Sequence, residues 1–429
     1  MHAPIQTASA RTLIGRIAPR TTQRYAGGDS MGKLRDPKNM RMVRRALCAG
    51  WIAAALAGTE TAADGTREVV EALETIRLRH DVPALAGAIV TTGGLDRAAA
   101  VGTRRRGDDA PATTNDLWHL GSCTKAMTAV LLARLAEKGG PGWETPLAGA
   151  FPGAAGSLHP GWTNVTLRHL VEHRAGLPGN LDWASFGRGG APVADQRIAV
   201  VRQALSSAPR SPPGSAYEYS NLGYVIAGAA AEQAAGVPWE EAIRREVFDP
   251  LGMKRTGFGG TGTPGELDQP WGHTENGRPV RRNGPDVDNP PVLGPAGRVH
   301  ATLHDWALFV ADQLRGVRGA PALLPAAACR SLHTPALGGE YAAGWVTVER
   351  PWGGGTVLSH NGCNTMNYSV AWVAPLRGFA VIVCVNQAGD RATKAADEAA
   401  SALIRLHLAS GTSERSATST GESYSGRSR

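Results

Sequence analysis

The sequence has none of the patterns that mark zinc-finger proteins, repeat proteins or proteins held in a membrane by a helix. It contains only five cysteines, and no two of them form a Cys-x-x-Cys pair, which excludes a zinc framework. It shows no internal repeat. The apolar run at residues 46–58 is too short for a stable membrane span, which needs about 20 residues.

The part of the chain that should fold also lacks net charge. The whole chain carries +8, but residues 1–57 hold ten Lys and Arg against two Asp, which accounts for all of it. The remaining residues contain 35 basic and 35 acidic side chains. Because the basic excess lies in the N-terminal segment, we expect no nucleic-acid partner.

This N-terminal extension ends in a segment that is typical of an export signal. Residues 42–45 (Met-Val-Arg-Arg) are basic and precede the apolar run, and residues 55–57 (Ala-Leu-Ala) form a small-x-small cleavage site. We therefore predict an exported protein, periplasmic or secreted, with a mature start near Gly58. The segment ahead of the signal is long, so either translation starts at Met40 or Met42, or that segment forms a disordered arm.

Strand-like segments occur near both ends of the remaining chain, with helical segments between them. The strand-like segments are 84–90, 97–103, 344–349, 355–359, 367–374 and 378–386, and the helical ones are 66–80, 167–173, 195–206, 222–235, 239–248 and 391–408. This order predicts an α/β (α+β) fold, in which one antiparallel sheet is built from both termini and flanked by helices, beside a mainly helical lobe.

The domain expected from this pattern covers residues 66–408. Its sheet lobe would comprise about 66–118 and 290–408, and its helical lobe about 119–289. The Gly- and Pro-dense residues 259–291 should form loops over the functional site. Residues 410–429 are rich in Ser, Gly, Thr and Arg and are predicted to be a disordered tail.

Ser122 and Lys125 form the first motif that carries chemistry. Residues 122–125 read Ser-Cys-Thr-Lys at the start of a helical run, and positions i and i+3 share one face of a helix. Lys125 can therefore reach the Ser122 hydroxyl. A lysine is protonated at its ordinary pKa of about 10.4, but burial by the apolar residues 126–135 would let it lose that proton and activate the serine.

Two further motifs follow downstream. Residues 219–221 read Tyr-Ser-Asn and residues 360–362 read His-Asn-Gly. With Ser-Cys-Thr-Lys, they resemble the Ser-x-x-Lys, Tyr-x-Asn and Lys/His-x-Gly motifs of the serine β-lactamase and penicillin-binding-protein superfamily. The closest branch contains class C β-lactamases, D-alanyl-D-alanine carboxypeptidases, amidases and esterases. The resemblance covers roughly residues 66–408 and implies the same fold.

The resemblance also implies three catalytic residues. Ser122 would attack an acyl carbon and form an acyl-enzyme, and Lys125 would take the Ser122 proton or share it with Tyr219. Tyr219 would carry a proton to the leaving group and help activate water for deacylation. A phenol suits this role only if nearby cations lower its pKa.

Four more residues would bind the substrate by the same resemblance. Asn221 would hydrogen-bond Lys125 and a substrate carbonyl, and His360 and Gly362 would belong to the strand along which the substrate lies. The backbone N–H of Cys363, together with that of Ser122, would stabilise the oxyanion.

The third motif departs from the β-lactamase pattern at two positions. His360 stands where β-lactamases have lysine, and histidine is charged only below about pH 6.5. Histidine is common here among esterase, amidase and peptidase relatives, so the resemblance disfavours efficient β-lactam hydrolysis. Asn361 stands where a small or hydroxylated residue is usual, and would narrow the site or add a contact.

Several other side chains have competing interpretations. His169 and His173 belong to a His-x-x-Glu-His sequence, a zinc-protease pattern, but the helix is broken soon after and no third ligand stands out, so no metal is expected. His119 would line the cleft or be structural. Tyr341 and Trp345 would line the cleft or pack in the core.

The cysteines that follow the predicted export signal are expected to be free thiols. Cys384 lies in an apolar strand-like run and should be buried. Cys123 and Cys363 each flank a motif, where they would either form a disulfide or, as we expect, stay free and buried.

We therefore predict an exported serine hydrolase that acts through an acyl-enzyme on an ester, amide or peptide bond of a small molecule, without a metal or organic cofactor. The substrate classes are D-amino-acid peptides, esters and β-lactams. The alternatives are a true class C-like β-lactamase, a non-catalytic penicillin-recognising binder and a zinc hydrolase. The sequence does not indicate an oligomeric state.

Overall fold

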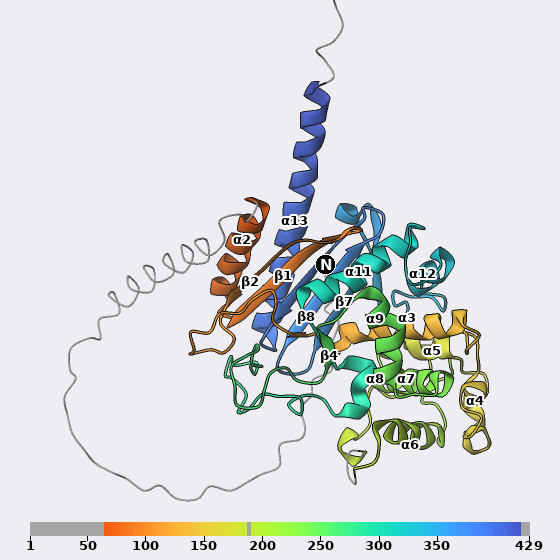
Figure 1. Cartoon of the computed structure of the whole chain (residues 1–429). Helices are drawn as coiled ribbons and strands as arrows, with labels where there is room; N and C mark the ends of the chain where they lie inside the picture. Colours follow the sequence, from red (N-terminus) through yellow and green to blue (C-terminus); the bar gives the residue numbers. More distant parts are fainter. Residues whose placement is uncertain (1–63, 187–189, 422–429) are drawn as a thin grey trace, which may run out of the picture. The chain divides into compact units, whose positions relative to one another are not determined.

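The computed structural model describes residues 64–186 and 190–421, so the predicted extension and export signal at 1–57 lie outside the described residues. The core of the fold is a six-stranded antiparallel sheet of order β2-β1-β9-β8-β7-β6 (Figure 1). Its strands are β1 (Ala84–Thr91), β2 (Gly94–Gly102), β6 (Val346–Arg350), β7 (Gly355–Cys363), β8 (Tyr368–Ala374) and β9 (Phe379–Val385). Because β1 pairs with β9, strands from both ends of the domain share one sheet, as the sequence predicts.

Helices cover both faces of this sheet. Along β1, Ala86 and Ala88 belong to one hydrophobic core whereas Leu85 and Ile89 belong to the other, which is the alternation expected of a strand buried on both faces. The helix α11 (Leu303–Val317) packs on the first face, and α2 (Asp64–His80) and α13 (Asp390–Gly421) pack on the second (Figure 1). The sheet is therefore the middle of three layers.

A mainly helical lobe lies beside the sheet, at the right of Figure 1. Its helices are α3 (Thr124–Glu137), α4 (Leu147–Ala150), α5 (Leu167–Val171), α6 (Val193–Leu205), α7 (Asn221–Ala235), α8 (Trp239–Ile243), which continues as a π-helical turn over Arg244–Phe248, and α9 (Asp249–Leu251). The helices α3 and α7 are buried over most of their length, so the ends that carry the sequence motifs are held rigidly.

The predicted fold class is confirmed by these layers, and the structure adds elements that the sequence analysis did not assign. These are the short sheet β3-β5-β4 (Trp118–His119, Val299–Ala301 and Thr256–Phe258) and the helices α10 (Gly294–Gly297), α11 and α12 (Ala326–Leu332). The start of α11 has a clear signal, because Thr302 caps the helix by accepting the Asp305 N–H at 3.1 Å.

The helix α13 is longer than the sequence predicts. The helix α13 was expected to end near 408 but continues to Gly421. No proline interrupts residues 390–421, so the backbone can continue its hydrogen bonding beyond the turns that pack on the sheet. Residues 422–429 lie outside the described residues.

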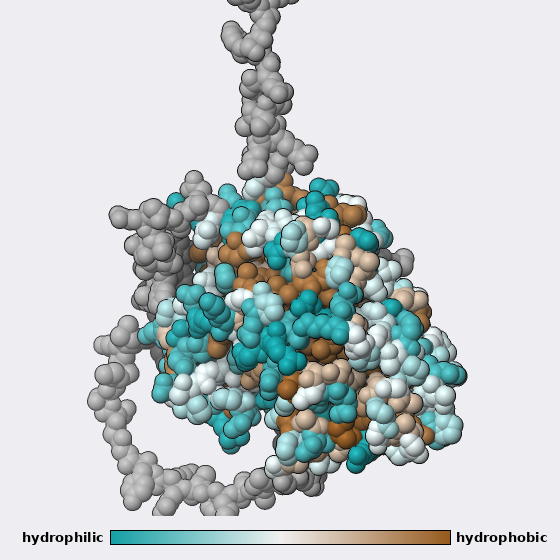
Figure 2. Space-filling view, turned by 45° about the vertical axis from the view of Figure 1, so that its right-hand side comes forward, coloured by the Kyte–Doolittle hydropathy of each residue, from teal (hydrophilic) through white to brown (hydrophobic). Residues whose placement is uncertain are grey.

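The surface of the described residues mixes hydrophilic and hydrophobic side chains. On the face shown in Figure 2, the hydrophobic ones gather in several patches between hydrophilic ones. Among the described residues, no helix combines the length and the apolar character that crossing a bilayer requires.

Candidate active site

Ser122 lies in a short 3-10 turn, Gly121–Cys123, that leads directly into α3. Gly121 adopts a positive φ of 49°, which glycine accepts most readily. Lys125 follows one turn later, and its side chain is wholly buried. The Lys125 Nζ lies 2.9 Å from the Ser122 Oγ, so the structure brings together the two residues that the spacing placed on one helix face.

The hydrogen-bond partners of the Lys125 Nζ match those that a neutral amine requires. Its Nζ lies 2.8 Å from the Asn221 Oδ1 and 2.7 Å from the Ala296 carbonyl oxygen. These two oxygens can accept the two N–H bonds of a neutral amine, which leaves the nitrogen lone pair directed at the Ser122 hydroxyl. Burial lowers the pKa of Lys125 well below its ordinary value. The arrangement therefore suits a lysine that accepts the serine proton.

The start of α7 brings the second motif to the same point. The Tyr219 hydroxyl donates to the Ser122 Oγ at 2.9 Å. Asn221 is the first residue of α7, and its Nδ2 donates to the Asn180 Oδ1 at 3.0 Å. This contact fixes the amide so that its oxygen faces Lys125. Asn180 was not singled out in the sequence, because nothing in its local pattern points to a partner on α7.

Tyr219 does not meet the condition set for an acidic phenol. The Tyr219 side chain is partly exposed, but desolvation around its hydroxyl raises the pKa of Tyr219 above its ordinary value, and the hydrogen bond with Ser122 offsets this only in part. Neither Lys125 nor His360 supplies the charged cation that would lower this pKa, because burial favours the neutral form of both. Tyr219 is therefore a protonated hydrogen-bond donor at neutral pH.

His360 is buried and neutral. Its Nδ1 lies 2.6 Å from the Asn361 carbonyl oxygen, and its Nε2 lies 2.9 Å from the Tyr341 hydroxyl. The carbonyl requires a proton on Nδ1, so Nε2 accepts from Tyr341. Burial lowers the pKa of His360 to about 3. His360 therefore supplies no charge to pair with a substrate carboxylate at physiological pH.

The end of β7 passes very close to the Ser122 turn. A Cβ on Gly362 would lie 2.0 Å from the Leu120 carbonyl oxygen and 2.7 Å from the Ser122 nitrogen. A Cβ on Gly121 would lie 2.5 Å from the Cys363 nitrogen. Only glycine fits at these two positions. The close approach brings the backbone nitrogens of Ser122 and Cys363 to the same site, as two donors to one oxyanion require.

A comparison with protein families identifies the family of this chain. The family model described as Beta-lactamase matches residues 59–404. The chain belongs to the beta-lactamase family.

Curated relatives in this family carry several activities in their names. The chain is 30% identical to "Penicillin-binding protein 4" of Amycolatopsis lactamdurans over 43% of this chain and 47% of that protein. It is 32% identical to "Esterase EstB" of Burkholderia gladioli over 47% of this chain and 53% of that protein. It is 30% identical to "D-alanyl-D-alanine-carboxypeptidase/endopeptidase AmpH" of Escherichia coli over 40% of this chain and 44% of that protein. The chain spans about half the length of these relatives.

Solved structures share the fold of this chain. A penicillin-binding protein homologue from Pyrococcus abyssi matches with a TM-score of 0.63 and 24% identity, over 80% of this chain and 77% of that chain. A class C β-lactamase from Rhodobacter sphaeroides matches with a TM-score of 0.62 and 21% identity, over 80% of this chain and 99% of that chain. At this level of identity, the likeness concerns the fold alone.

Asn361 does not narrow the site of this beta-lactamase-family protein. Successive side chains of a strand point to opposite faces, so Asn361 points away from the face that His360 occupies. Its Nδ2 donates to the Tyr368 hydroxyl at 3.1 Å, and Tyr368 belongs to the core on the α13 side of the sheet. The expectation of a narrowed site or a substrate contact is therefore wrong.

The cysteines are all free in the described part of the chain. Cys384 is buried in β9, and Cys123 is buried behind Ser122, as predicted. Cys363 is free but exposed, which corrects the expectation of a buried thiol. It is the last residue of β7.

His169 and His173 have separate contacts. The His169 ring accepts the Thr166 N–H at 3.2 Å and closes the capping box of α5. His173 lies beyond the end of α5 at φ 58°, and its ring centroid lies 4.5 Å from that of Tyr219 and 4.4 Å from that of Tyr341. Within residues 64–186 and 190–421, no group of three potential metal ligands is found.

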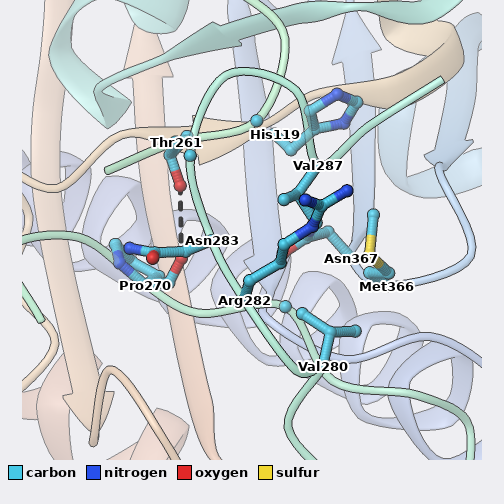
Figure 3. A pocket seen from close by; sticks show the side chains of 12 residues that line it. His119, Thr261, Pro270, Val280, Arg282, Asn283, Val287, Met366 and Asn367 are labelled. Atoms are coloured by element: carbon cyan, nitrogen blue, oxygen red, sulfur yellow. Dashed lines mark hydrogen bonds between the residues drawn. The ribbon is translucent and has the colours of Figure 1, made fainter. Parts of the chain in front are cut away.

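His119 lies at a small cavity between two segments of the chain. Figure 3 shows it beside Val287 of the 259–291 loop region, with Met366 and Asn367 of the β7–β8 turn nearby. The loops of this region thus lie against the strand that leads into Ser122. Tyr341 contacts His360, as described above, whereas Trp345 is buried in the core.

Proposed function

We propose that the protein is an exported serine hydrolase that forms an acyl-enzyme on Ser122 and cleaves an ester, amide or peptide bond of a small molecule. The observation that carries this proposal is the Ser122 Oγ, which lies 2.9 Å from both the Lys125 Nζ and the Tyr219 hydroxyl. The relatives named as an esterase and a carboxypeptidase support this class of substrate.

The first half-reaction follows from these contacts. The Ser122 proton passes to the lone pair of Lys125 while Oγ attacks the acyl carbon, and the oxyanion forms beside the backbone N–H groups of Ser122 and Cys363. Tyr219 donates a proton to the leaving oxygen or nitrogen, and protonated Lys125 returns one to Tyr219. In the second half-reaction, water takes the place of the leaving group and the same groups act in reverse.

The neutral His360 points to substrates that need no cation at this position. Esters and D-amino-acid amides or peptides with uncharged reactive ends meet this condition, whereas a penicillin carries a carboxylate. A class C-like β-lactamase remains the second candidate, because the Ser122, Lys125 and Tyr219 arrangement serves both reactions.

One experiment separates these outcomes. The mature protein, starting near Gly58, is mixed with benzylpenicillin or with p-nitrophenyl butyrate, and its intact mass and the product are followed from seconds to an hour. A lasting penicillin adduct would indicate a peptidase-like enzyme, and drug consumption without an adduct would indicate a β-lactamase. Ester hydrolysis with the drug intact would indicate an esterase. If neither compound nor a D-alanyl amide reacts, the proposal of a hydrolase is wrong.

Export has its own test. The intact mass of the protein recovered from the periplasm or medium of a producing bacterial culture should correspond to a start near Gly58. Recovery only from the cytoplasm, with residues 46–57 still attached, would contradict export.

The pH dependence should report the ionisation of Lys125. Protonated Lys125 cannot accept the serine proton, so kcat/KM for p-nitrophenyl butyrate should fall as the pH falls through the lowered pKa of this lysine. His360 has a pKa of about 3, so it should add no second inflection to the pH–rate profile near the ordinary pKa of histidine. The check is a pH–rate profile for the wild type and for His360→Gln. An acid limb that shifts in His360→Gln would contradict this assignment.

His360→Lys should change selectivity toward β-lactams. A charged lysine at this position would attract the penicillin carboxylate, and a net gain of about 1.4 kcal/mol gives a factor of roughly ten. We expect benzylpenicillin acylation to accelerate by that order, with little gain for p-nitrophenyl butyrate. His360→Gln, which is uncharged, is the matched control. Equal effects of the two variants would show that charge at this position does not set selectivity.

A further inference from the structure

The carboxylate of Asp288 is enclosed beside the proposed oxyanion site and receives three hydrogen-bond donors. Its side chain has no exposed surface. The Oδ2 lies 2.9 Å from the His119 Nε2 and 3.3 Å from the Arg298 Nε. The Oδ1 accepts from the Asn364 Nδ2 at 2.9 Å. The Arg298 guanidinium and the two other donors favour the ionised form of this buried group, so Asp288 is a carboxylate at neutral pH.

One of these contacts continues to the nucleophile. The His119 Nδ1 accepts the Gly121 N–H at 3.1 Å, so a neutral imidazole must carry its proton on Nε2 and donate it to Asp288. Asp288 therefore favours the His119 tautomer in which Nδ1 is free to accept the Gly121 N–H. Gly121, with its positive φ, sets the direction in which the next backbone N–H, that of Ser122, points.

A second contact continues to the other proposed oxyanion donor. Asn364 follows Cys363 directly, and its Oδ1 accepts the backbone N–H of Asn367 at 2.9 Å and that of Met366 at 3.3 Å. This amide therefore organises the turn after β7 with its oxygen and binds Asp288 with its nitrogen. Met366 and Asn367 of this turn line the same small cavity as Val287, which precedes Asp288 (Figure 3).

We propose that Asp288 is a positioning residue that holds both flanks of the oxyanion site, through His119 on the Ser122 side and through Asn364 on the Cys363 side. The inference rests on the acyl-enzyme function proposed above. Asp288 contacts neither Ser122 nor Cys363, so its effect passes through the backbone. Hydrogen bonds to an ionised acceptor are about twice as strong as neutral ones, and Arg298 balances the buried charge.

The carboxylate is suited to this task because it can accept on both oxygens. An amide of the same shape accepts on one side only and presents N–H groups on the other. In Asp288→Asn, the oxygen of the new amide can accept a hydrogen bond from either His119 or Asn364. Its N–H groups then face the N–H of the other residue, and that hydrogen bond is lost. Asp288→Asn therefore breaks one of the two connections without removing volume.

Exchanging the side chains at positions 288 and 364 should restore both hydrogen-bond connections. In the double variant Asp288→Asn with Asn364→Asp, the amide nitrogen at 288 can donate to the new carboxylate, and the amide oxygen can still accept from His119. The new carboxylate at 364 keeps the acceptors that the Met366 and Asn367 N–H groups need. The single variant Asn364→Asp places two carboxylates against each other and should resemble Asp288→Asn.

The matched control is Asp312→Asn. Asp312 lies on α11, its side chain is equally enclosed with 1% exposure, and it accepts the Leu323 N–H at 2.9 Å. It is therefore also a buried, hydrogen-bonded carboxylate, but it has no contact with the proposed site. Any loss that comes from disturbing a buried carboxylate in general should appear in this variant as well.

The experiment measures kcat and KM for p-nitrophenyl butyrate, the inhibition constant of phenylboronic acid, and fluorophosphonate labelling of Ser122, with thermal melting as a check on folding. A boronate bound to serine resembles the tetrahedral intermediate and so reports the oxyanion site. Removing one oxyanion donor costs about 10²–10³ in kcat, so misplacing donors should cost at least about tenfold. We expect that loss in kcat and in boronate affinity for both single variants, with KM within about twofold.

The outcomes separate this inference from the proposed function. If the wild type is not labelled at Ser122 and hydrolyses no substrate, the proposed function is wrong and the inference falls with it. If the wild type is labelled but Asp288→Asn keeps its kcat and boronate affinity, only the inference is wrong. Recovery of kcat in the double variant, with Asp312→Asn unchanged, is the expected result. If kcat of the double variant is no higher than that of the single variants, or if Asp312→Asn loses kcat to a similar extent, the inference is wrong. Asp288 would then contribute only to folding in general.

Discussion

Ser122→Ala is expected to abolish hydrolysis and every covalent adduct. The Ser122 Oγ is the atom that the Lys125 Nζ and the Tyr219 hydroxyl share, and no acyl-enzyme can form without it. Loss of the nucleophile in another serine hydrolase lowers kcat by about 10⁶-fold, so we expect a fall of at least roughly 10⁴-fold here. The measurements are kcat for p-nitrophenyl butyrate and the intact mass after treatment with benzylpenicillin and with a fluorophosphonate.

The control for this variant is Ser206→Ala. Ser206 is an exposed serine at the end of α6, and its hydroxyl bonds only the local backbone, so its loss should leave both rate and adduct unchanged. Thermal melting should show that Ser122→Ala is folded, since the change removes one oxygen atom and no buried apolar contact. Full activity in Ser122→Ala would show that another residue is the nucleophile.

The sheet could be predicted because its signal is local. The run at β9, Phe379–Val385, is apolar at every position, which is typical of a strand buried on both faces. The structure buries it between α11 and α13. The length of α13 could not be predicted, because the Ser-, Gly- and Thr-rich composition after residue 409 is typical of a disordered segment, whereas the backbone continues the helix from the turns that pack on the sheet.

The site could be predicted only where its residues are neighbours in the sequence or form a motif. Ser122 and Lys125 are three residues apart, so helical geometry alone brings them together. Asp288 lies 169 positions from His119, and Asn180 lies 41 positions from Asn221. Such pairs depend on the packing of whole segments, and no periodicity in one segment indicates its partner in another.

The charges in the site depend on burial, which sequence cannot supply. His360 was expected to be charged only at acidic pH, but its burial against Tyr341 keeps it neutral down to a pKa of about 3. Desolvation also raises the pKa of the Tyr219 hydroxyl and lowers that of the wholly buried Lys125. The direction of each shift follows from the loss of solvent, which depends on tertiary contacts between segments that are distant in the sequence.

Lys125→Ala is expected to lower the rate of acylation by roughly 10³-fold or more, which is within the range for loss of a general base. The variant also leaves the Asn221 Oδ1 and the Ala296 carbonyl without their partner, so a folding defect must be separated from a chemical one. Lys125→Met fills the same volume without a basic nitrogen. We expect both variants to melt as folded proteins and to form the fluorophosphonate adduct far more slowly than the wild type.

Lys125→Arg distinguishes a base from a fixed positive charge. A guanidinium stays protonated in proteins, so it can supply charge to the site but cannot accept the Ser122 proton. If Lys125 acts as the base, Lys125→Arg should be as slow as Lys125→Met at every pH, and the acid limb of the pH–rate profile should vanish with the group that causes it. If Lys125→Arg instead keeps most of the rate, the lysine acts as a cation. The neutral amine inferred from its two carbonyl partners and its burial would then be wrong, and Tyr219 would be the remaining candidate for the base.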